Sequence, residues 1–432
     1  MAMEIITLFV NRVMNAGLYE GIKIPNDGPM LSHLCYADDV LFLGRWSVQN
    51  AVTLSRLLRW LNLVTGLKVN FQKSKLYGFG VDEEEKLRLA SVLKCEVGKL
   101  LFSYLGIPIG VNMKRSKYWD LVINKFSAKL SKWKAKFLSL AGRVTLAKLV
   151  LGSLPSYFLS LFVAPKCVIN KLEKIRRDFV WGFSGSIKKM RWVRWEGIVN
   201  SKRKGGLGVG SIRDFNIAML TKWWWRYNSN PNQLWTKVFC SIHKNNSNLL
   251  IPLKKTILGV WNDIGKMDKV LDKAGLSLIQ NLVVENGVWK WRSSAEVGFS
   301  VKQVRLDLES CRVANPAVDP ALVWNSWAPA KGNILLWRAL LGRIASKEEL
   351  VKYVKDCPGS ATWKRLVSTV VIATVWRIWS ARNSKVFEDI FIPIMKTVEF
   401  IKEDAFLWVS NRAKNMKPTW EKWVLFDVVD LM

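Results

Sequence analysis

His33–Leu43 reads HLCYADDVLFL, and this stretch decides how the N-terminal part of the chain is interpreted. Two adjacent carboxylates, Asp38 and Asp39, stand between apolar runs that are typical of strands. At a tight turn, both side chains can direct oxygens toward one ion, and magnesium prefers such ligands. A plain hairpin turn explains the pair equally well, because Asp is common in turns for local hydrogen-bonding reasons. The stretch alone leaves both interpretations open.

Further motifs follow at a characteristic spacing. After Tyr36–Asp39 (YADD) come Thr65–Asn70 (TGLKVN), Lys73-Ser74 and Tyr104–Gly110 (YLGIPIG). In order and spacing, these segments resemble the reverse transcriptase of plant LINE-type non-LTR retrotransposons. Later segments that continue the pattern are Ala141–Arg143, Leu154-Pro155, Phe179–Gly182, Gly205–Gly208 and Lys222-Trp223. The resemblance therefore extends over nearly the whole chain.

The resemblance implies an RNA-directed DNA polymerase that uses magnesium or manganese. It implies that Asp38 ligates two metal ions, that Asp39 supports them, and that Lys73 protonates the leaving pyrophosphate. The implied partners are an RNA template, a DNA primer and deoxynucleoside triphosphates. The resemblance implies that Tyr104–Gly110 is the hairpin that grips the primer end. Residues that it places at the nucleic acid are Tyr36, Tyr104, Gly106 and Arg143. For Lys73 a surface lysine remains an equal interpretation, and for Tyr104–Gly110 an ordinary Gly/Pro turn is the alternative.

Two segments that this family needs are not found ahead of Tyr36. One is a further Asp on an earlier palm strand, and the other is a Gln-Gly-Asp-Pro-type segment at the template pocket. The only acids ahead of Tyr36 are Glu4, Glu20 and Asp27, and Asp27 lies in a Pro/Gly-rich loop. We therefore expect the C-terminal part of a polymerase that is truncated and inactive by itself.

The net charge of +32 is unevenly distributed along the chain. Residues 111–230 carry 25 basic and 5 acidic side chains, whereas residues 1–110 carry 12 and 10. Residues 231–432 carry 29 basic and 19 acidic side chains. A field this concentrated favours a polyanionic partner, whose phosphates release counterions on contact. Nucleic acid is the leading candidate.

A helix with one apolar and one basic face is predicted at the start of this basic block. Apolar residues recur at helical spacing at Trp119, Val122, Phe126, Leu130, Trp133 and Phe137. Lysines follow the same spacing beside them, at Lys125, Lys129, Lys132 and Lys136. We expect the first set in the core and the second on nucleic acid. The alternative for the lysines is a solvated face with their stems on apolar surface.

Tryptophan is abundant, with 23 residues that include the run Trp223–Trp225. Such side chains can stack on unpaired bases, but packing is the favoured interpretation for consecutive aromatics on a helix. Gly205–Gly208 follows three basic residues, yet it lacks the Lys-Ser/Thr ending of a phosphate-binding P-loop. No nucleotide-binding role is assigned to it.

The C-terminal part resembles the zinc-binding region of many plant reverse transcriptases of this type. The flanking segments Val323–Trp327 and Val375–Asn383 are present. Between them, where the family places its Cys and His ligands, the sequence contains only Cys357. Because a structural zinc site normally takes four Cys or His ligands, no zinc is expected in this chain. For Trp376 and Arg382, packing on a helix is then the accepted interpretation.

The six cysteines are scattered singly, which fits a reducing intracellular compartment, either nucleus or cytoplasm. Met1–Val13 is predicted to be an amphipathic helix and not a signal peptide, so secretion is not expected. Leu149–Pro165 is short for a membrane span and contains Pro155. It is predicted to form two buried helical pieces, and no membrane partner is expected.

We expect an α+β fold that is predominantly helical. The predicted regions are a partial palm at 1–110, a basic helical thumb-like region at 111–230, a connection region at 231–322, and a degenerate zinc-binding-type region at 323–432. Beyond residue 110 little sheet is expected, with Val283–Trp291 and Gly298–Val304 as the strand-like runs. Two alternatives to a polymerase stay open: an inactive relic without a role, and a non-enzymatic nucleic-acid-binding protein that retains the basic surface.

Overall fold

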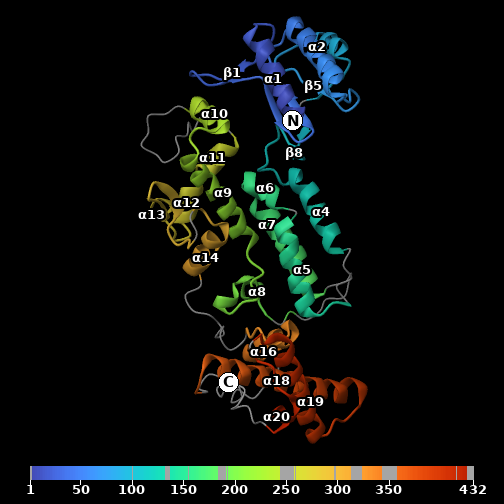
Figure 1. Cartoon of the computed structure of the whole chain (residues 1–432), viewed down its shortest axis with the longest axis vertical. Helices are drawn as coiled ribbons and strands as arrows, with labels where there is room; N and C mark the ends of the chain where they lie inside the picture. The colour runs from blue at the N-terminus through green and yellow to red at the C-terminus, as the bar shows by residue number, and fades with distance from the viewer. Residues whose placement is uncertain are drawn as a thin grey trace.

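The computed structural model shows an elongated, predominantly helical chain, which confirms the predicted α+β class (Figure 1). The N-terminal elements lie at one end, the long helices α18 and α19 at the other, and the remaining helices between them. Among the described residues, the strands form only two-stranded sheets. The structure describes residues 2–99, 101–131, 137–153, 155–182, 191, 193–243, 257, 259–295, 298–312, 324–342, 358–414 and 416–425.

The N-terminal part combines three helices with short antiparallel strand pairs and one parallel pair, β5–β6. Its elements are α1 (Ala2–Asn15), β1 (Ile22–Lys23), β2 (Met30–Leu31), β3 (His33–Tyr36), β4 (Asp39–Phe42), α2 (Val48–Thr65), β5 (Lys75–Leu76), α3 (Glu83–Leu93), β6 (Glu96–Val97), β7 (Ser103–Tyr104) and β8 (Ile107–Pro108). The predicted amphipathic helix at the start is confirmed, since α1 buries Ile6 and Val10 against Leu57 and Leu61 of α2. Helix α2 begins where the Ser47 side chain accepts a hydrogen bond from a backbone amide.

The next part of the chain forms a continuous helical core. Its elements are η1 (Ser116–Trp119), α4 (Asp120–Ser131), α5 (Leu140–Ser153), α6 (Ser156–Leu161), α7 (Lys166–Trp181), α8 (Trp195–Val199), η3 (Lys202–Lys204) and α9 (Ile212–Ser229). The core face predicted for α4 is confirmed at Trp119, Val122, Phe126 and Leu130, which are all buried. Phe137 is 73% exposed, so its assignment to this buried face was wrong; it lies beyond the described part of α4, whose last residue is Ser131. Trp133 lies outside the described residues.

A buried polar network fixes α7 to the segment that leads into α9. The guanidinium of Arg176, which is fully buried, donates to Glu173 and to the carbonyl oxygens of Val209 and Gly210 at 3.0–3.1 Å. Burial lowers the pKa of Arg176, and the Glu173 carboxylate opposes that effect. Glu173 also accepts from the amide of Ile212 at 2.9 Å. The network therefore satisfies a charge that would otherwise be costly to bury.

The following part of the chain packs around a separate hydrophobic core, to which α9 also contributes side chains. It contains α10 (Leu234–Ile242), α11 (Val260–Ile264), α12 (Met267–Asp272), α13 (Leu278–Asn281), β9 (Leu282–Glu285), β10 (Val288–Trp291) and α14 (Val301–Arg312). The strand-like run Val283–Trp291 is confirmed as the β9–β10 hairpin. Gly298–Val304 was wrongly expected to be strand-like. Its second half starts α14, because the Ser300 hydroxyl accepts from the amide of Gln303 and so favours a helix.

The C-terminal part contains α16 (Ala330–Leu340), α18 (Ala361–Glu388), α19 (Ile394–Arg412) and α20 (Trp420–Val424). Trp337 of α16 is fully buried and donates to the carbonyl oxygen of Gly205 at 2.7 Å, which joins this part to the preceding helices. Trp376 packs against the C-terminal core as expected. Arg382 is exposed, so a packing role was wrong for it, since its position on α18 faces away from that core.

The Leu149–Pro165 segment forms two helical pieces, as predicted. The end of α5 and the whole of α6 lie on either side of Pro155. Leu159 is buried, but Leu149 is 63% exposed, so burial is only partial. No helix among the described residues has the length and apolar character needed to cross a bilayer.

Candidate nucleic-acid interface

The two carboxylates of the YADD segment lie at the tip of the β3–β4 hairpin. Tyr36 pairs with Asp39, and Ala37 and Asp38 form the turn between them. Ala37 has a φ of 50°, a left-handed conformation that is unusual for a residue with a Cβ. Tyr36 is 64% exposed, and both carboxylates are also exposed. The hairpin therefore presents an aromatic ring and two charges together on the surface.

The base of this hairpin is held through His33. Its Nε2 lies 3.1 Å from the hydroxyl of Thr7 in α1, and its Nδ1 lies 2.9 Å from the hydroxyl of Ser32. Burial lowers the pKa of His33 below its ordinary value. The neutral imidazole thus links the hairpin to the first helix.

The second predicted hairpin is formed by β7 and β8. Leu105 and Gly106, with φ values of 50° and 77°, form its turn, and a two-residue turn of this kind favours glycine. The amide of Ile109 donates to Phe102 at 2.7 Å and extends the pairing beyond the strands. The turn conformation therefore explains why glycine stands at position 106. Contact of Gly106 with a primer stays a prediction.

Tyr104 of the second hairpin is affected electrostatically by the first hairpin. Burial raises the pKa of Tyr104, and the negative charge of Asp39 raises it further, followed by Cys35 and Tyr157. Burial also raises the pKa of Tyr157, with a further contribution from Tyr36. The charge of Asp39 thus acts on Tyr104, and Tyr36 acts on Tyr157, although these residues come from three separate segments.

Tyr157 was not among the residues selected from the sequence. It lies in α6, directly after the Leu154-Pro155 landmark, and it is 45% exposed. The landmark was the available signal, since it positions the start of α6. Nothing in the spacing itself places α6 beside the YADD hairpin, because that proximity arises from tertiary packing.

Asp38 and Asp39 provide part of the oxygen ligands that a divalent cation prefers. Within the part of the chain that the structure describes, there is no group of three or more His, Cys, Asp or Glu side chains that could hold a metal ion. The described residues therefore do not fit a complete two-metal site. No reaction step through a metal is derived from them.

Lys73 lies in the turn after α2, where its backbone amide donates to Asn70. Its side chain is exposed. No ion pair joins it to Asp38 or Asp39, and the structure describes all three residues. The structure does not bring Lys73 together with the carboxylates through an observed contact, and its role as an acid stays a prediction.

The basic edge of α4 is described for its first two lysines. Lys125 is exposed and Lys129 is half-buried, whereas Val122, Phe126 and Leu130 face the core. Lys132 and Lys136 lie outside the described residues. Over the described part of α4, buried apolar and outward basic positions therefore alternate as the spacing predicts.

Arg143 has a structural contact at the end of α7. Gly182 ends α7 with a φ of 68°. The guanidinium of Arg143 occupies the space that a Cβ on Gly182 would take. Burial lowers the pKa of Arg143. A cation beside the carbonyl end of a helix is favourable. This contact gives Arg143 a structural role that needs no ligand. Contact of Arg143 with nucleic acid stays a prediction.

The backbone amides of the glycine-rich segment around Gly206 form hydrogen bonds within the protein. The amides of Gly206, Gly208 and Gly210 donate to backbone oxygens of residues 199–201 at 2.6–2.9 Å. A Cβ on Gly206 would overlap the carbonyl oxygen of Asn200. These amides do not point at a phosphate, in line with assigning the segment no nucleotide-binding role.

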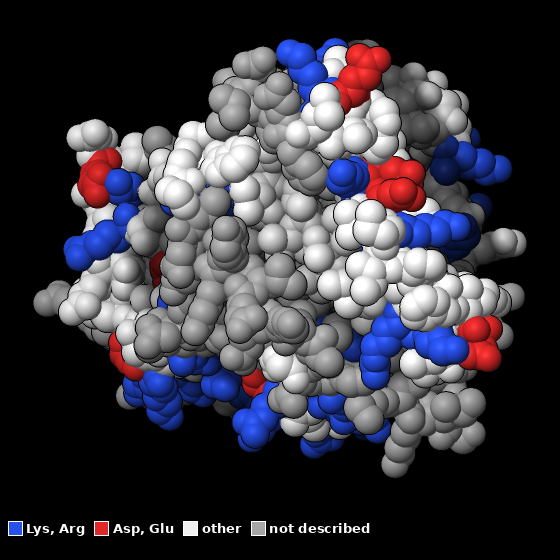
Figure 2. Space-filling model, turned by 90° about the horizontal axis from the view of Figure 1, so that it is seen from below, with Lys and Arg blue, Asp and Glu red and all other residues white. Residues whose placement is uncertain are grey.

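The surface charge of the C-terminal end is also predominantly basic. Viewed from that end, Lys and Arg side chains cover more of the surface than Asp and Glu do (Figure 2). The acidic side chains visible there mostly have a basic neighbour. The positive field of the molecule is therefore not confined to α4.

Two proteins of Arabidopsis thaliana are similar to parts of this chain. The "Putative ribonuclease H protein At1g65750" is 38% identical over 117 residues, which make up 27% of this chain and 19% of that protein. The "Uncharacterized mitochondrial protein AtMg00310" is 30% identical over 99 residues, 23% of this chain and 64% of that protein. The chain has plant relatives. Each match covers less than two thirds of the relative, and no family model matches the chain.

Proposed function

We propose that this chain derives from a plant retroelement, has a reverse-transcriptase-type architecture, and binds a template–primer duplex of RNA and DNA. The observation that carries the proposal is the YADD hairpin, whose turn presents Tyr36, Asp38 and Asp39 together on the surface. The similarity to two plant proteins, one of them named for ribonuclease H, supports the retroelement origin.

In this proposal, the two hairpins contact the primer terminus and α4 follows the duplex backbone. Tyr36 and Tyr104 supply aromatic surface next to the terminus, whereas Lys125 and Lys129 neutralise phosphates. The concentration of 25 basic against 5 acidic residues in 111–230 supports a polyanionic partner there. Asp38 and Asp39 are then near the primer 3′ end.

Photocrosslinking tests this placement. A DNA primer with a photoreactive 3′-terminal nucleotide, annealed to RNA, is crosslinked to the full chain, and the modified peptides are identified by mass spectrometry. Crosslinks are expected within residues 31–43 and 101–114. Crosslinks confined to residues 324–425 would contradict the placement. A primer with the same group at its 5′ end serves as the control.

RNA-directed DNA synthesis is the second candidate function, because the turn of the YADD hairpin exposes two adjacent carboxylates, Asp38 and Asp39. Primer extension on RNA with magnesium or manganese tests it, with Asp38→Ala as the matched variant. Synthesis that Asp38→Ala abolishes would establish polymerisation. No synthesis by either protein would leave duplex binding as the function.

A further inference from the structure

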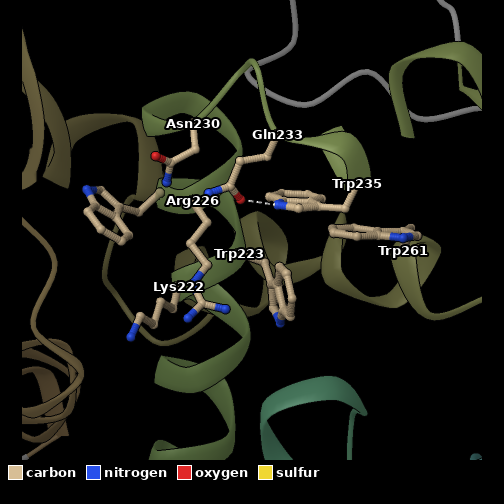
Figure 3. A pocket seen from close by; sticks show the side chains of 8 residues that line it. Lys222, Trp223, Arg226, Asn230, Gln233, Trp235 and Trp261 are labelled. Carbon is tan, nitrogen blue, oxygen red and sulfur yellow. Dashed lines mark hydrogen bonds between the residues drawn. The ribbon is translucent and has the colours of Figure 1, made fainter. Parts of the chain in front are cut away.

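A pocket lies between the C-terminal end of α9 and the helices α10 and α11 (Figure 3). Its volume is about 700 Å³, which is within the range of about 300–1,000 Å³ for small-ligand sites. Four tryptophans and two cations line most of it. They are Lys222, Trp223, Trp225, Arg226, Trp235 and Trp261.

Three of the tryptophans form an ordered aromatic wall. The rings of Trp235 and Trp261 are parallel within 1°, with centroids 5.4 Å apart. Trp223 stands nearly perpendicular to both, at 81° to Trp235 and 80° to Trp261. Parallel-displaced and edge-to-face arrangements are those that aromatic pairs prefer. The wall therefore keeps its shape without a ligand.

Hydrogen bonds fix three of the indoles further. The Nε1–H groups of Trp223 and Trp225 donate to the carbonyl oxygens of Ser160 and Trp289, each at 2.7 Å. Trp235 donates to Gln233 at 2.6 Å, as the dashed line in Figure 3 shows. A preformed aromatic surface loses little conformational entropy on binding, which favours a flat ligand.

The three tryptophans of the run differ in how deeply they are buried. Trp224 is buried, with only 4% of its surface exposed, and it donates to the carbonyl oxygen of Ile264 at 2.8 Å. Its neighbours Trp223 and Trp225 are only half-buried and face the pocket. The run thus divides between the core and a surface cavity.

The two cations on α9 have no opposite charge in the pocket. Lys222 and Arg226 lie one helical turn apart, and no acidic side chain lines the pocket. Within the described residues, neither forms an ion pair. Burial lowers the pKa of Lys222, and Arg226 lowers it further, so the like charges act on each other. An anion between them would relieve this repulsion.

We propose that this pocket binds an unpaired nucleotide of a single-stranded nucleic acid, with the base against the tryptophan wall and a phosphate at Lys222 and Arg226. Base stacking on aromatic side chains beside a basic groove is the usual physics of single-strand binding. This proposal shares with the proposed function the assignment of nucleic acid as the partner, and it rests on the proposed function in that respect alone. The pocket lies in a different part of the chain from the YADD hairpin.

Fluorescence anisotropy with the full chain tests the proposal. The probes are a labelled oligothymidylate, an abasic strand of equal length, and an RNA–DNA duplex. Trp235→Ala is expected to weaken oligothymidylate binding about tenfold, the order of one lost stack, and to leave abasic-strand and duplex binding unchanged. Lys222→Gln combined with Arg226→Gln is expected to weaken binding of both single strands.

Matched controls separate the possible causes. Lys237→Gln combined with Lys269→Gln removes the same charge from exposed positions outside the pocket lining and should change nothing. The charge variants keep the proposal falsifiable if Trp235→Ala does not fold. Unchanged oligothymidylate binding in all pocket variants would overturn the proposal, as would an equal loss for the duplex.

Two further outcomes are informative. Efficient competition by thymidine monophosphate would assign the pocket to a free nucleotide and overturn the single-strand assignment. Wild-type protein that binds oligothymidylate but not the duplex would support the pocket while contradicting the proposed function. The two proposals can therefore fail separately.

Discussion

The N-terminal hairpin region and the helical region that follows it are stabilised in different ways. In the first, two small clusters around Leu57 and Leu89 support sheets of only two strands, and Trp60 and Phe79 remain more than 60% exposed. In the second, one continuous core contains Trp119 and extends to Trp337. The candidate primer site thus lies on a lightly supported hairpin, whereas the basic surface lies on a well-packed frame.

The charge distribution follows the same division. The balance of basic and acidic residues is 12 to 10 over 1–110 and 25 to 5 over 111–230. A strongly packed frame can tolerate that self-repulsion until a polyanion relieves it. We therefore expect substitutions in the helical frame to have large effects on stability, and substitutions at the hairpin to have small ones.

The largest effect on stability is expected at Arg176. Arg176→Met removes a buried charge that bonds to Glu173 and two carbonyl oxygens, so the free energy of unfolding should fall by about 3–5 kcal/mol. Chemical denaturation followed by tryptophan fluorescence measures it. Lys174→Met, at an exposed neighbouring position, is the matched control and should be nearly neutral. Equal behaviour of the two variants would contradict the role of the network.

A pair of glycine substitutions sharpens the comparison within the helical region. Gly206→Ala places a Cβ on the carbonyl oxygen of Asn200, so unfolding should become easier by about 1–3 kcal/mol. Gly142→Ala meets its nearest atom only at 3.7 Å inside α5 and should stabilise by about 0.5–1 kcal/mol. Thermal unfolding of both variants gives the test. A stabilised Gly206→Ala protein would show that the turn is not as tight as described.

The smallest effect is expected at the hairpin, through His33. Because burial lowers its pKa below 6.5, the folded state favours neutral imidazole. Its contribution to stability is therefore fully present above pH 6.5 and is lost as the pH falls through the lower folded value.

Histidine resonances in NMR spectra measure this titration directly, since the chain has 2 histidines and His33→Gln assigns them. His33 should titrate below 6.5 in the folded protein and at its ordinary value in denaturant. A folded value at or above 6.5 would break the link between the hairpin and α1.

Periodic features could be predicted from the sequence, whereas tertiary neighbours could not. The apolar spacing of Val122, Phe126 and Leu130 was enough to predict the buried face of α4. The carboxylate pair between two apolar runs was enough to predict the turn of the β3–β4 hairpin. Phe137 matched that spacing but is 73% exposed. Spacing gives a register and does not give how far along the chain the buried face continues.

The site was only partly predictable for a related reason. Tyr36 of the YADD hairpin acts on the pKa of Tyr157 in α6, and Trp235 meets Trp261 across separate helices. Neither pair has a local signal in the sequence. The run Trp223–Trp225 indicated packing, but the helix turns two of its three rings toward a pocket. Which face of α9 is covered depends on elements that follow much later in the chain.

The affinity for an RNA–DNA duplex, measured over a range of salt concentrations, tests the central claim most directly. The test variant changes four lysines to Gln, namely Lys125, Lys129, Lys132 and Lys136. The control variant removes the same charge from exposed positions in the C-terminal part, namely Lys364, Lys396, Lys414 and Lys417.

We expect wild-type affinity to fall steeply with salt and the test variant to bind more weakly at every concentration. The slope of log affinity against log salt should drop by about one for each lysine that contacts a phosphate. The control variant should retain most of the wild-type affinity. A test variant with the affinity and the salt slope of the wild type would contradict the claim that the basic helical face binds nucleic acid.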